Sequence, residues 1–235
     1  MHRTLAIIPA RGGSKRIPRK NIREFLGKPI ISYSIEAAIK SNIFTEVMVS
    51  TDDLEISNIS KAYGAQVPFI RSKENSGDYA TTASVILEVL KAYQKLGENF
   101  DQFCCIYPAA PFVSAEIIKE SYHALLMNSA DSLVPIGKFC YPIYRALIVQ
   151  NAKLKFLWPE NADARSQDLI VAYHDAGQFY WCDTNSFLLQ RKLIMEKTIP
   201  LLMDEMDFQD IDNINDWELA ELKYKLRESN ANKRY

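Results

Sequence analysis

Several features that mark common classes of protein are missing from this sequence. Its 235 residues hold no apolar run long enough to cross a bilayer, so no membrane association is expected. Lysine and arginine total 28 against 29 aspartates and glutamates, and the resulting net charge of −1 does not suit a general nucleic-acid binder. The four cysteines form no CxxC pair, and the N-terminus shows no signal-peptide cleavage pattern. We therefore expect a cytoplasmic protein with reduced thiols.

The best-known catalytic and nucleotide-binding motifs are also missing. The sequence contains neither GxxxxGK[ST] nor GxGxxG, which argues against a Walker loop and against a dinucleotide fold of the usual kind. It has no HExxH, no cysteine–histidine metal spacing and no GxSxG, so neither a familiar zinc site nor a serine-hydrolase elbow is expected. Any phosphate or metal chemistry would rest on a less common pattern.

Strand and helix signals alternate regularly over the first part of the chain. Short apolar runs are followed by amphipathic segments of helical period, which predicts an α/β fold with a doubly wound, mostly parallel sheet. The expected strands cover 5–10, 46–51, 67–71, 102–108 and 132–137, and the expected helices cover 31–42, 54–64, 82–96 and 115–127.

The regularity is lost after about Lys138. It returns as a strand, a turn and a strand within 171–182, and as a C-terminal helix that Asn215 is expected to cap. No linker or repeat divides the sequence. We expect a single domain over 1–235, with an inserted, protruding segment at about 138–170.

The most informative stretch is the loop after the first expected strand, within AIIPARGGSKRIPRKN at 6–21. Two adjacent glycines, Gly12 and Gly13, let the backbone turn tightly and expose N–H groups around an anion-sized hollow. The cations of the loop are Arg11, Lys15, Arg16, Arg19 and Lys20. Because α/β folds bind ligands at the carboxyl ends of parallel strands, the loop is predicted to bind phosphate groups. A solvated basic loop is the alternative.

A second feature is the acidic segment FQDIDN, in which Asp210 and Asp212 flank Ile211. In an extended backbone, residues i and i+2 point to the same side, so the two carboxylates can share one hard cation. Mg²⁺ prefers one or two protein carboxylates together with substrate phosphates, and the basic loop in the same chain favours this metal. The alternative is a solubilising acidic turn before the helix.

Single polar residues near other strand ends are further candidates. Asp53 is expected to cap the helix after the second strand, and Asp52 to face the ligand crevice. Arg71 ends the third expected strand, where it can reach a base or a phosphate or can be an ordinary surface cation. The histidines show no metal-ligand spacing, and His174 beside Asp175 can line a pocket.

Three stretches together resemble one known family. IIPARGGSKRIPRKNI, the following VSTDD and the late FQDIDNINDWELAE are similar to segments of the CMP-sugar synthetases, which activate nonulosonic and related sugar acids with CTP. The resemblance runs from Ile7 to about Glu221. It implies a Rossmann-like nucleotidyltransferase fold, CTP as co-substrate, Mg²⁺ as cofactor, a sugar acid as the second small-molecule substrate, and a homodimer. A non-catalytic nucleotide-binding protein is the alternative, but it would not need the paired carboxylates.

The resemblance also implies roles for individual residues. Those implied to hold the triphosphate are Arg11, Gly12, Gly13, Ser14, Lys15, Lys20 and Asn21. Those that resemble the cytosine-reading positions are Arg71, Ala80 and Thr82. Asp210 and Asp212 would hold Mg²⁺. The candidates for a catalytic role are Lys15, Lys20 and Asp212.

Two stretches depart from the sialic acid synthetases and look like the pseudaminic acid branch of the family, which serves bacterial flagellin and surface-glycan glycosylation. They are YPAAPF at 107–112 and YHDAGQFY at 173–180. The implied sugar is pseudaminic acid, with sialic, legionaminic or another 2-keto sugar acid as alternatives. The segment at 138–170 is expected to form the dimer contact and part of a neighbour's sugar pocket. Residues expected to contact the sugar are Tyr107, Lys138, Arg165, Gln167, Asp168, Tyr173 and His174. For Lys138 and Arg165, a plain surface position is the alternative.

Overall fold

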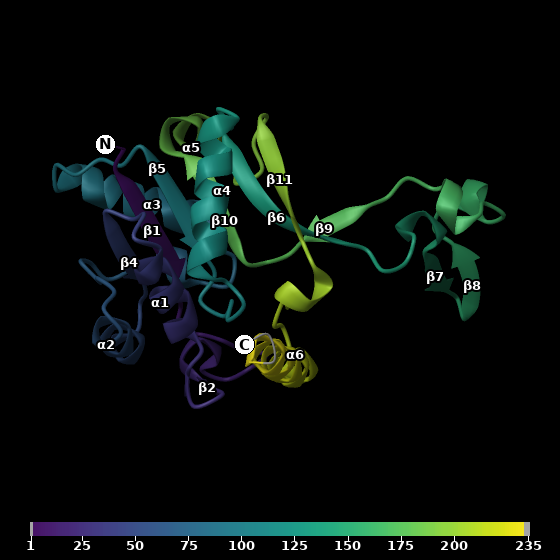
Figure 1. Ribbon diagram of the computed structural model, residues 1–235, viewed down its shortest axis with the longest axis horizontal. Coiled ribbons are helices and arrows are strands. Elements are labelled where there is room, and N and C mark those ends of the chain that lie inside the picture. The colour runs from purple at the N-terminus through teal and green to yellow at the C-terminus, as the bar shows by residue number, and fades with distance from the viewer. Residues whose placement is uncertain (1, 233–235) are drawn as a thin grey trace.

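A seven-stranded mixed sheet runs through the centre of the computed structural model, which describes residues 2–232 (Figure 1). The strands are β1 Thr4–Pro9, β4 Glu46–Ser50, β5 Gln102–Ile106, β6 Ser132–Lys138, β9 Tyr173–Asp175, β10 Phe179–Asp183 and β11 Thr198–Met203. Their order is β11-β6-β10-β5-β1-β4, with β9 paired to β6 off this path. β1 pairs in parallel with β4 and β5, and β6 with β11, whereas β9 and β10 run antiparallel to their neighbours. The predicted α/β class with a parallel-rich sheet is confirmed.

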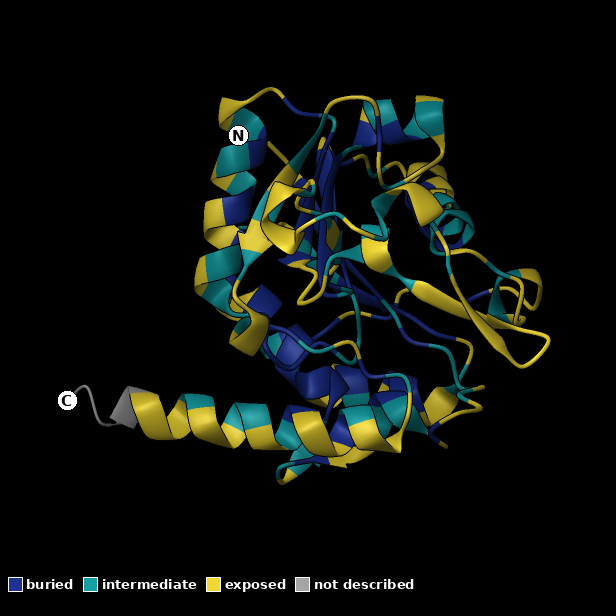
Figure 2. Cartoon of the chain, turned by 90° about the vertical axis from the view of Figure 1, so that its right-hand side faces the viewer, coloured by how far each residue is buried: buried dark blue, intermediate teal, exposed yellow. Residues whose placement is uncertain are grey.

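Helices cover both faces of this sheet. They are α1 Ile31–Ser41, α2 Leu54–Ala62, α3 Thr82–Lys95, α4 Ala115–Met127 and α5 Thr184–Gln190. The last helix, α6 Ile214–Asn232, instead packs through Trp217 in a separate cluster with Ile17 and Phe25. Alternate side chains of β1 divide the core: Ala6 and Ile8 pack with α1, α2 and α4, whereas Leu5 and Ile7 pack with α3 and α5. The central strands are buried on both sides, dark blue in Figure 2, which explains why QFCCI of β5 is continuously apolar.

One expected strand is wrong. Residues 67–71 form no strand, and the segment touches the sheet through an isolated bridge between Gln66 and Met48 of β4. Pro68 has no N–H to donate, so a regular ladder cannot continue along β4. The other expected strands and helices have counterparts within a few residues, as do the strand, turn and strand of 171–182, which form β9 and β10.

Residues 139–172 leave the sheet between β6 and β9 and form an arm that stands away from the body (Figure 1). Inside the arm, β7 Leu147–Gln150 and β8 Lys153–Phe156 pair as a separate hairpin. A second small hairpin, β2 Glu24–Phe25 with β3 Lys28–Pro29, follows the basic loop. The arm corresponds to the protruding segment predicted at about 138–170. Within residues 2–232, no helix has both the length and the apolar character needed to cross a bilayer.

Candidate active site

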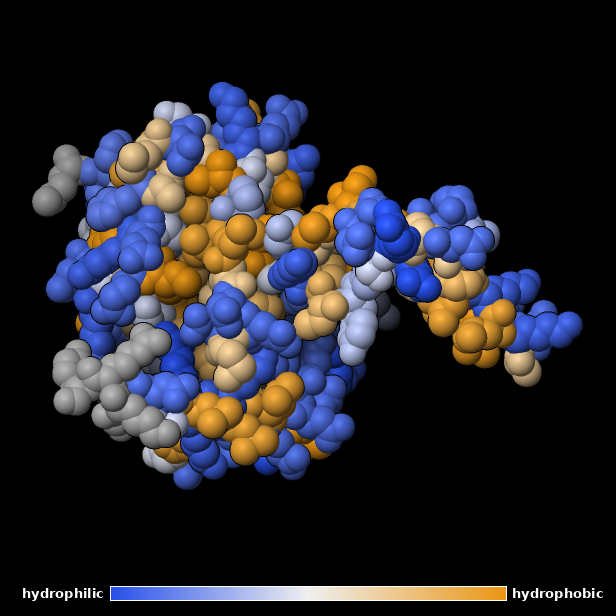
Figure 3. Space-filling model, turned by 45° about the vertical axis from the view of Figure 1, so that its right-hand side comes forward, coloured by the Kyte–Doolittle hydropathy of each residue, from blue (hydrophilic) through white to orange (hydrophobic). Residues whose placement is uncertain are grey.

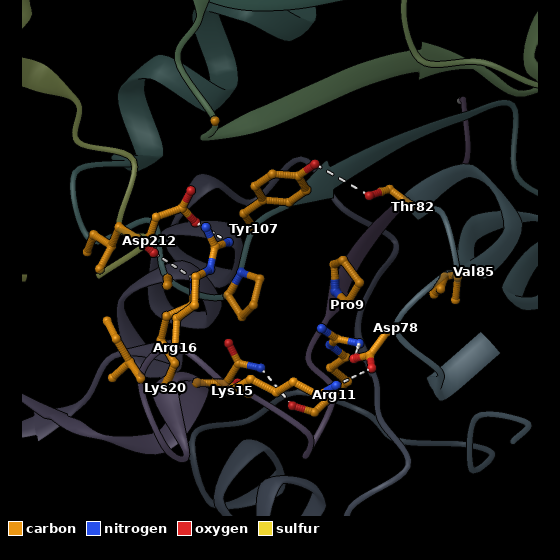
Figure 4. A pocket seen from close by; sticks show the side chains of 18 of the residues that line it. Pro9, Arg11, Lys15, Arg16, Lys20, Asp78, Thr82, Val85, Tyr107 and Asp212 are labelled. Carbon is orange, nitrogen blue, oxygen red and sulfur yellow. Dashed lines mark hydrogen bonds and ion pairs between the residues drawn. The ribbon is translucent and has the colours of Figure 1, made fainter. Parts of the chain in front are cut away.

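A cleft of about 380 Å³ opens where the parallel strands β1 and β5 end (Figure 4). Because β10 runs antiparallel to β5, β10 starts at the edge of the sheet where β5 ends. The turn that precedes β10 therefore lies at this edge and also reaches the cleft. The remaining walls come from the segment between α2 and α3 and from the segment before α6. The predicted site residues that line the cleft are Arg11, Ser14, Lys15, Lys20, Asn21, Arg71, Ala80, Thr82, Tyr107, Asp210 and Asp212.

The loop after β1 is anchored from behind, and four of its five cations line the cleft, whereas Arg19 pairs with Asp53 and Glu55. Ile17 is buried in a cluster with Phe25 and with Trp217 of α6. Asn21 is also buried, and its Nδ2 donates to the carbonyl of Arg11 at 3.0 Å. Asn21, which the resemblance implied to hold the triphosphate, therefore closes the loop on itself.

Lys20 joins the basic loop to the acidic segment. Its Nζ donates to the carbonyl of Ile211 at 2.7 Å. Burial lowers the pKa of Lys20, and the nearby carboxylates of Asp212 and Asp210 oppose that change. An ammonium group is thus held beside the two carboxylates predicted to bind metal.

The glycines of the loop do not present a ring of free amides. A Cβ on Gly12 would lie 2.7 Å from Oδ2 of Asp53, so glycine is needed there for close packing. The Gly12 N–H donates to Oδ1 of Asp52 at 2.9 Å, and the Ser14 N–H donates to the Gly12 carbonyl at 3.0 Å. Asp52 is therefore engaged with the loop, while Asp53 caps α2 as expected, accepting the N–H of Ile56. The positive charge at the cleft comes mainly from side chains.

Three loop cations are paired with carboxylates around the cleft, as Figure 4 shows. Arg11 lies 3.1 Å from Oδ1 of Asp78, and Lys15 contacts the other oxygen of the same carboxylate. Arg16 lies 2.6 Å from Oδ1 of Asp212. Asp78 is not among the predicted site residues, because nothing in the polar segment between α2 and α3 singles out one acid as a partner of the distant basic loop.

The acidic segment has the predicted alternation. Ile211 is buried in the same cluster as Ile17, and its neighbours Asp210 and Asp212 line the cleft. Burial and the charge of Asp212 raise the pKa of Asp210, because two like charges lie close together in a partly dehydrated place. A bound cation would relieve this repulsion.

The first turn of α6 fixes the position of Asp212. Asp216 Oδ2 accepts the N–H groups of Asp212 and Asn213, at 2.9 and 3.0 Å. Asn213 Oδ1 in turn accepts the N–H groups of Asn215 and Asp216, at 2.9 and 3.1 Å. The helix is therefore capped by Asn213, two residues before the predicted Asn215, with Asp216 as the reciprocal partner.

The donor atoms at this end of the cleft fit Mg²⁺. Asp210 and Asp212 offer carboxylate oxygens, and the lining contains neither cysteine nor histidine. Among residues 2–232, no group of three or more His, Cys, Asp and Glu side chains is arranged to hold a metal. A cation here would take its other ligands from phosphate groups and water, which is the coordination that Mg²⁺ prefers.

Arg71 is a fixed, buried side chain rather than a surface cation. Its Nε donates to Oγ of Ser50 at 3.0 Å, and its guanidinium also donates to the Ser50 carbonyl. On the same side of the cleft, Oγ1 of Thr82 lies 3.4 Å from the hydroxyl of Tyr107 (Figure 4). This end of the cleft is thus lined by neutral hydroxyls and one immobile guanidinium.

The turn before β10 supports the acidic segment. Asp175 accepts the N–H of Gly177 at 2.8 Å and the hydroxyl of Tyr180 at 2.7 Å. Gly177 has φ of +63°, and a Cβ there would lie 3.3 Å from Cγ of Asp210. Gln178 is fully buried, and its Nε2 reaches the Gln209 carbonyl at 3.4 Å. This stretch was predicted to contact the sugar alone, and its closeness to Asp210 is visible only in the structure.

Three predicted sugar contacts, Arg165, Gln167 and Asp168, lie on the arm and do not line the cleft of their own chain. Arg165 and Gln167 are exposed, and Nε of Arg165 is 2.7 Å from Oδ2 of Asp168. Among residues 2–232, no hydrogen bond or ion pair links these side chains to the basic loop or the acidic segment.

The remaining three predicted sugar contacts lie where the arm joins the sheet. Lys138 on β6 and Tyr173 on β9 are opposite each other in the strand register, and both are exposed. The ring of His174 packs against Phe139 and Phe208, with centroids 4.9 and 5.6 Å away. His174 also lines an open apolar hollow at the base of the arm, separate from the cleft described above.

A doubly wound α/β sheet with a cationic loop after its first strand, and with paired carboxylates across the same cleft, defines a nucleotidyltransferase. The chain belongs to the cytidylyltransferase family, whose model matches residues 5–213. It is 41% identical over 230 residues to a pseudaminic acid cytidylyltransferase of Campylobacter jejuni, covering 97% of this chain and 99% of the relative. It is 31% identical to a CMP-N,N′-diacetyllegionaminic acid synthase of Legionella pneumophila, with 97% of each covered.

A solved structure has the same fold. The synthetase for CMP-2-keto-3-deoxy-manno-octonic acid, complexed with CTP, superposes with a TM-score of 0.68 and covers 97% of this chain and 99% of its own. Sequence identity is 14%, so this likeness concerns the fold alone. It confirms the Rossmann-like nucleotidyltransferase fold predicted above.

Proposed function

We propose that this protein transfers the CMP group of CTP to pseudaminic acid and releases pyrophosphate. The product would supply the glycosylation of bacterial flagellin or surface glycans. The Campylobacter jejuni relative, which bears the name of this activity, is similar over nearly its whole length and supports the choice of sugar. The observation that carries the nucleotide chemistry is that the cations Lys15 and Lys20 line the same cleft as the carboxylates of Asp210 and Asp212.

The reaction needs alignment and charge neutralisation more than covalent help from the protein. The anomeric oxygen of the sugar acid forms a bond to the α-phosphorus and loses its proton. The bond from that phosphorus to pyrophosphate breaks, and pyrophosphate leaves. Arg11, Lys15 and Lys20 supply positive charge for the triphosphate and for the leaving group. Ser14 and Asn21 line the same cleft, and the lining position of Arg71, which is held by Ser50, supports a contact with the nucleoside.

We also propose that Asp210 and Asp212 hold Mg²⁺. When bound, the ion would offset phosphate charge and lower the pKa of the attacking hydroxyl. The chain's own part is to keep both carboxylates on one side of Ile211 and to fix Asp212 against the first turn of α6. Lys20, whose Nζ donates to the Ile211 carbonyl between the two carboxylates, then balances the remaining negative charge.

The arm supports a homodimer as the working form. Figure 3 shows apolar side chains gathered on it, and Val149 and Leu154, which are opposite each other on β7 and β8, are 76% and 66% exposed. Exposed apolar patches of this kind mark sites of protein contact. We propose that the arm packs on a second copy and brings Arg165 and Gln167 to the sugar end of the partner's cleft.

A panel of sugar acids tests the proposed activity. Pyrophosphate release from CTP is measured with pseudaminic, N,N′-diacetyllegionaminic, sialic and 2-keto-3-deoxy-manno-octonic acids, with and without Mg²⁺. We expect release only when Mg²⁺ and a nonulosonic acid are both present, and the highest kcat/KM with pseudaminic acid. A preference for another acid of the panel would change the proposed sugar substrate but not the proposed transfer of CMP from CTP. No release with any acid would contradict the proposed function.

A double substitution tests the dimer. Val149→Asp with Leu154→Asp puts two charges on the exposed face of the arm hairpin and is expected to convert a dimer to a monomer in sedimentation velocity. The control is Leu189→Asp, which should stay dimeric because Leu189 is 84% exposed on α5, a helix that lies away from the arm (Figure 1). A monomeric unmodified protein, or a double variant that remains dimeric, contradicts the proposed interface.

A further inference from the structure

One carboxylate is paired with two of the cations that the proposed function assigns to the triphosphate. Asp78 Oδ1 lies 3.1 Å from NH1 of Arg11, and Asp78 Oδ2 contacts Nζ of Lys15. Arg11 also donates to the carbonyl of Gly77 at 3.2 Å. The anion site of the basic loop is thus filled by an anion of the protein itself.

The segment that carries Asp78 is held in place on both sides. Upstream, both Ser72 and Asn75 donate side-chain hydrogen bonds to the carboxylate of Glu88 on α3. Downstream, Thr81 caps α3 by accepting the N–H of Ser84. Asp78 lies between these two fixed points, so its carboxylate is presented to the basic loop by the fold rather than by chance.

The ion pairs between Asp78 and the basic loop can be broken by a competing anion. The side chains of Asp78 and Lys15 are 44% and 74% exposed, and exposed ion pairs are weak because water and salt screen them. The hydrogen bond from Lys15, together with the charges of Lys15 and Arg11, lowers the pKa of Asp78, so it is a carboxylate at neutral pH. A phosphate chain with several negative charges can displace such a partner, whereas an isolated solvent anion gains little by doing so.

We propose that Asp78 competes with phosphate groups for Arg11 and Lys15, and that this competition weakens the hold of the cleft on pyrophosphate after the reaction. This inference rests on the proposed function, in which pyrophosphate is the leaving group. When Asp78 competes for Arg11 and Lys15, CTP still keeps its contacts at the nucleoside end of the cleft. Free pyrophosphate has no nucleoside and is held only by the cations. The returning carboxylate therefore favours release of the product.

The test is direct binding of inorganic pyrophosphate by calorimetry, with Asp78→Asn compared to the unmodified protein. Asparagine keeps the shape of the side chain and removes its charge. We expect the dissociation constant of pyrophosphate to fall about three- to tenfold, as removal of a weak exposed competitor implies. Product inhibition by pyrophosphate in the CTP reaction should strengthen by a similar factor.

Glu74→Gln is the matched control, because Glu74 is an exposed acid of the same segment with no ion pair among the described residues. It should leave pyrophosphate binding unchanged. Unchanged or weaker pyrophosphate binding in Asp78→Asn, or equal tightening in Glu74→Gln, overturns the inference.

Lys15→Ala separates this inference from the proposed function. If Lys15→Ala weakens binding of both CTP and pyrophosphate while Asp78→Asn tightens neither, the phosphate site stands and only the competition fails. If Lys15→Ala changes neither, the loop is not the phosphate clamp and both proposals fail. In the double variant Lys15→Ala/Asp78→Asn, the tightening should shrink, because one of the contested cations has been removed.

Discussion

Replacing Asp212 with asparagine is expected to lower kcat by about 100-fold or more while the protein remains folded. The substitution keeps the shape of the side chain and the backbone contact with α6 but removes one of the two negative charges that the proposed Mg²⁺ needs. The Asp212 N–H still donates to Asp216, so the start of α6 is not disturbed. The measurement is steady-state pyrophosphate release over a range of Mg²⁺ concentrations, together with circular dichroism of the variant.

Asp207→Asn is the matched control for this loss. Asp207 lies five residues before Asp212, does not line the cleft, and has only a long ion pair of 3.8 Å with Arg227. It should retain nearly full activity. Turnover of Asp212→Asn close to that of the unmodified protein would remove Asp212 from the metal site, and equal losses in both variants would point to a general effect of charge.

The parts of the fold that sequence patterns predict are those stabilised by local rules. β5 is recognisable because a strand buried on both faces must be apolar throughout, and α4 because Ser114 caps it and accepts the N–H of Ile117. The strand expected at 67–71 fails because its residues suit a strand but Pro68 cannot continue a ladder along β4. The antiparallel direction of β10 is set by long-range pairing with β5 and β6, which periodicity does not encode.

The residues of the candidate site also divide into those that local patterns predict and those that depend on contacts distant in sequence. Asp210 and Asp212 could be predicted as a pair because alternation about a buried residue needs only the local backbone. The basic loop could be predicted from its place after the first strand. Asp78 could not, because its partners are more than 60 residues away in sequence and an exposed acid between two helices has no pattern of its own. The role of the loop amides also needed the structure, since Asp52 binds the one at Gly12.

The contact between Gly177 and Asp210 leads to a second large effect. Gly177→Ala is expected to lower kcat about tenfold and to raise the Mg²⁺ concentration needed for half-maximal rate. The added methyl group would lie 3.3 Å from Cγ of Asp210, which is tighter than ordinary contact, so the carboxylate must move by a few tenths of an ångström. Small displacements at a site that works by alignment are costly in rate. The rate at varied Mg²⁺ and fixed saturating CTP measures this.

The same substitution also strains the backbone, because Gly177 has φ of +63° and this left-handed region is unfavourable for alanine. Gly97→Ala isolates this effect, since Gly97 has φ of +80° and no atom within 4 Å of the added Cβ. Both variants should lose thermal stability, by roughly 2–4 °C for each kcal/mol of strain in a protein of this size. Only Gly177→Ala should lose rate and Mg²⁺ response. If the two variants have equal kinetics, the turn before β10 does not position Asp210, and the acidic segment depends on α6 and Lys20 alone.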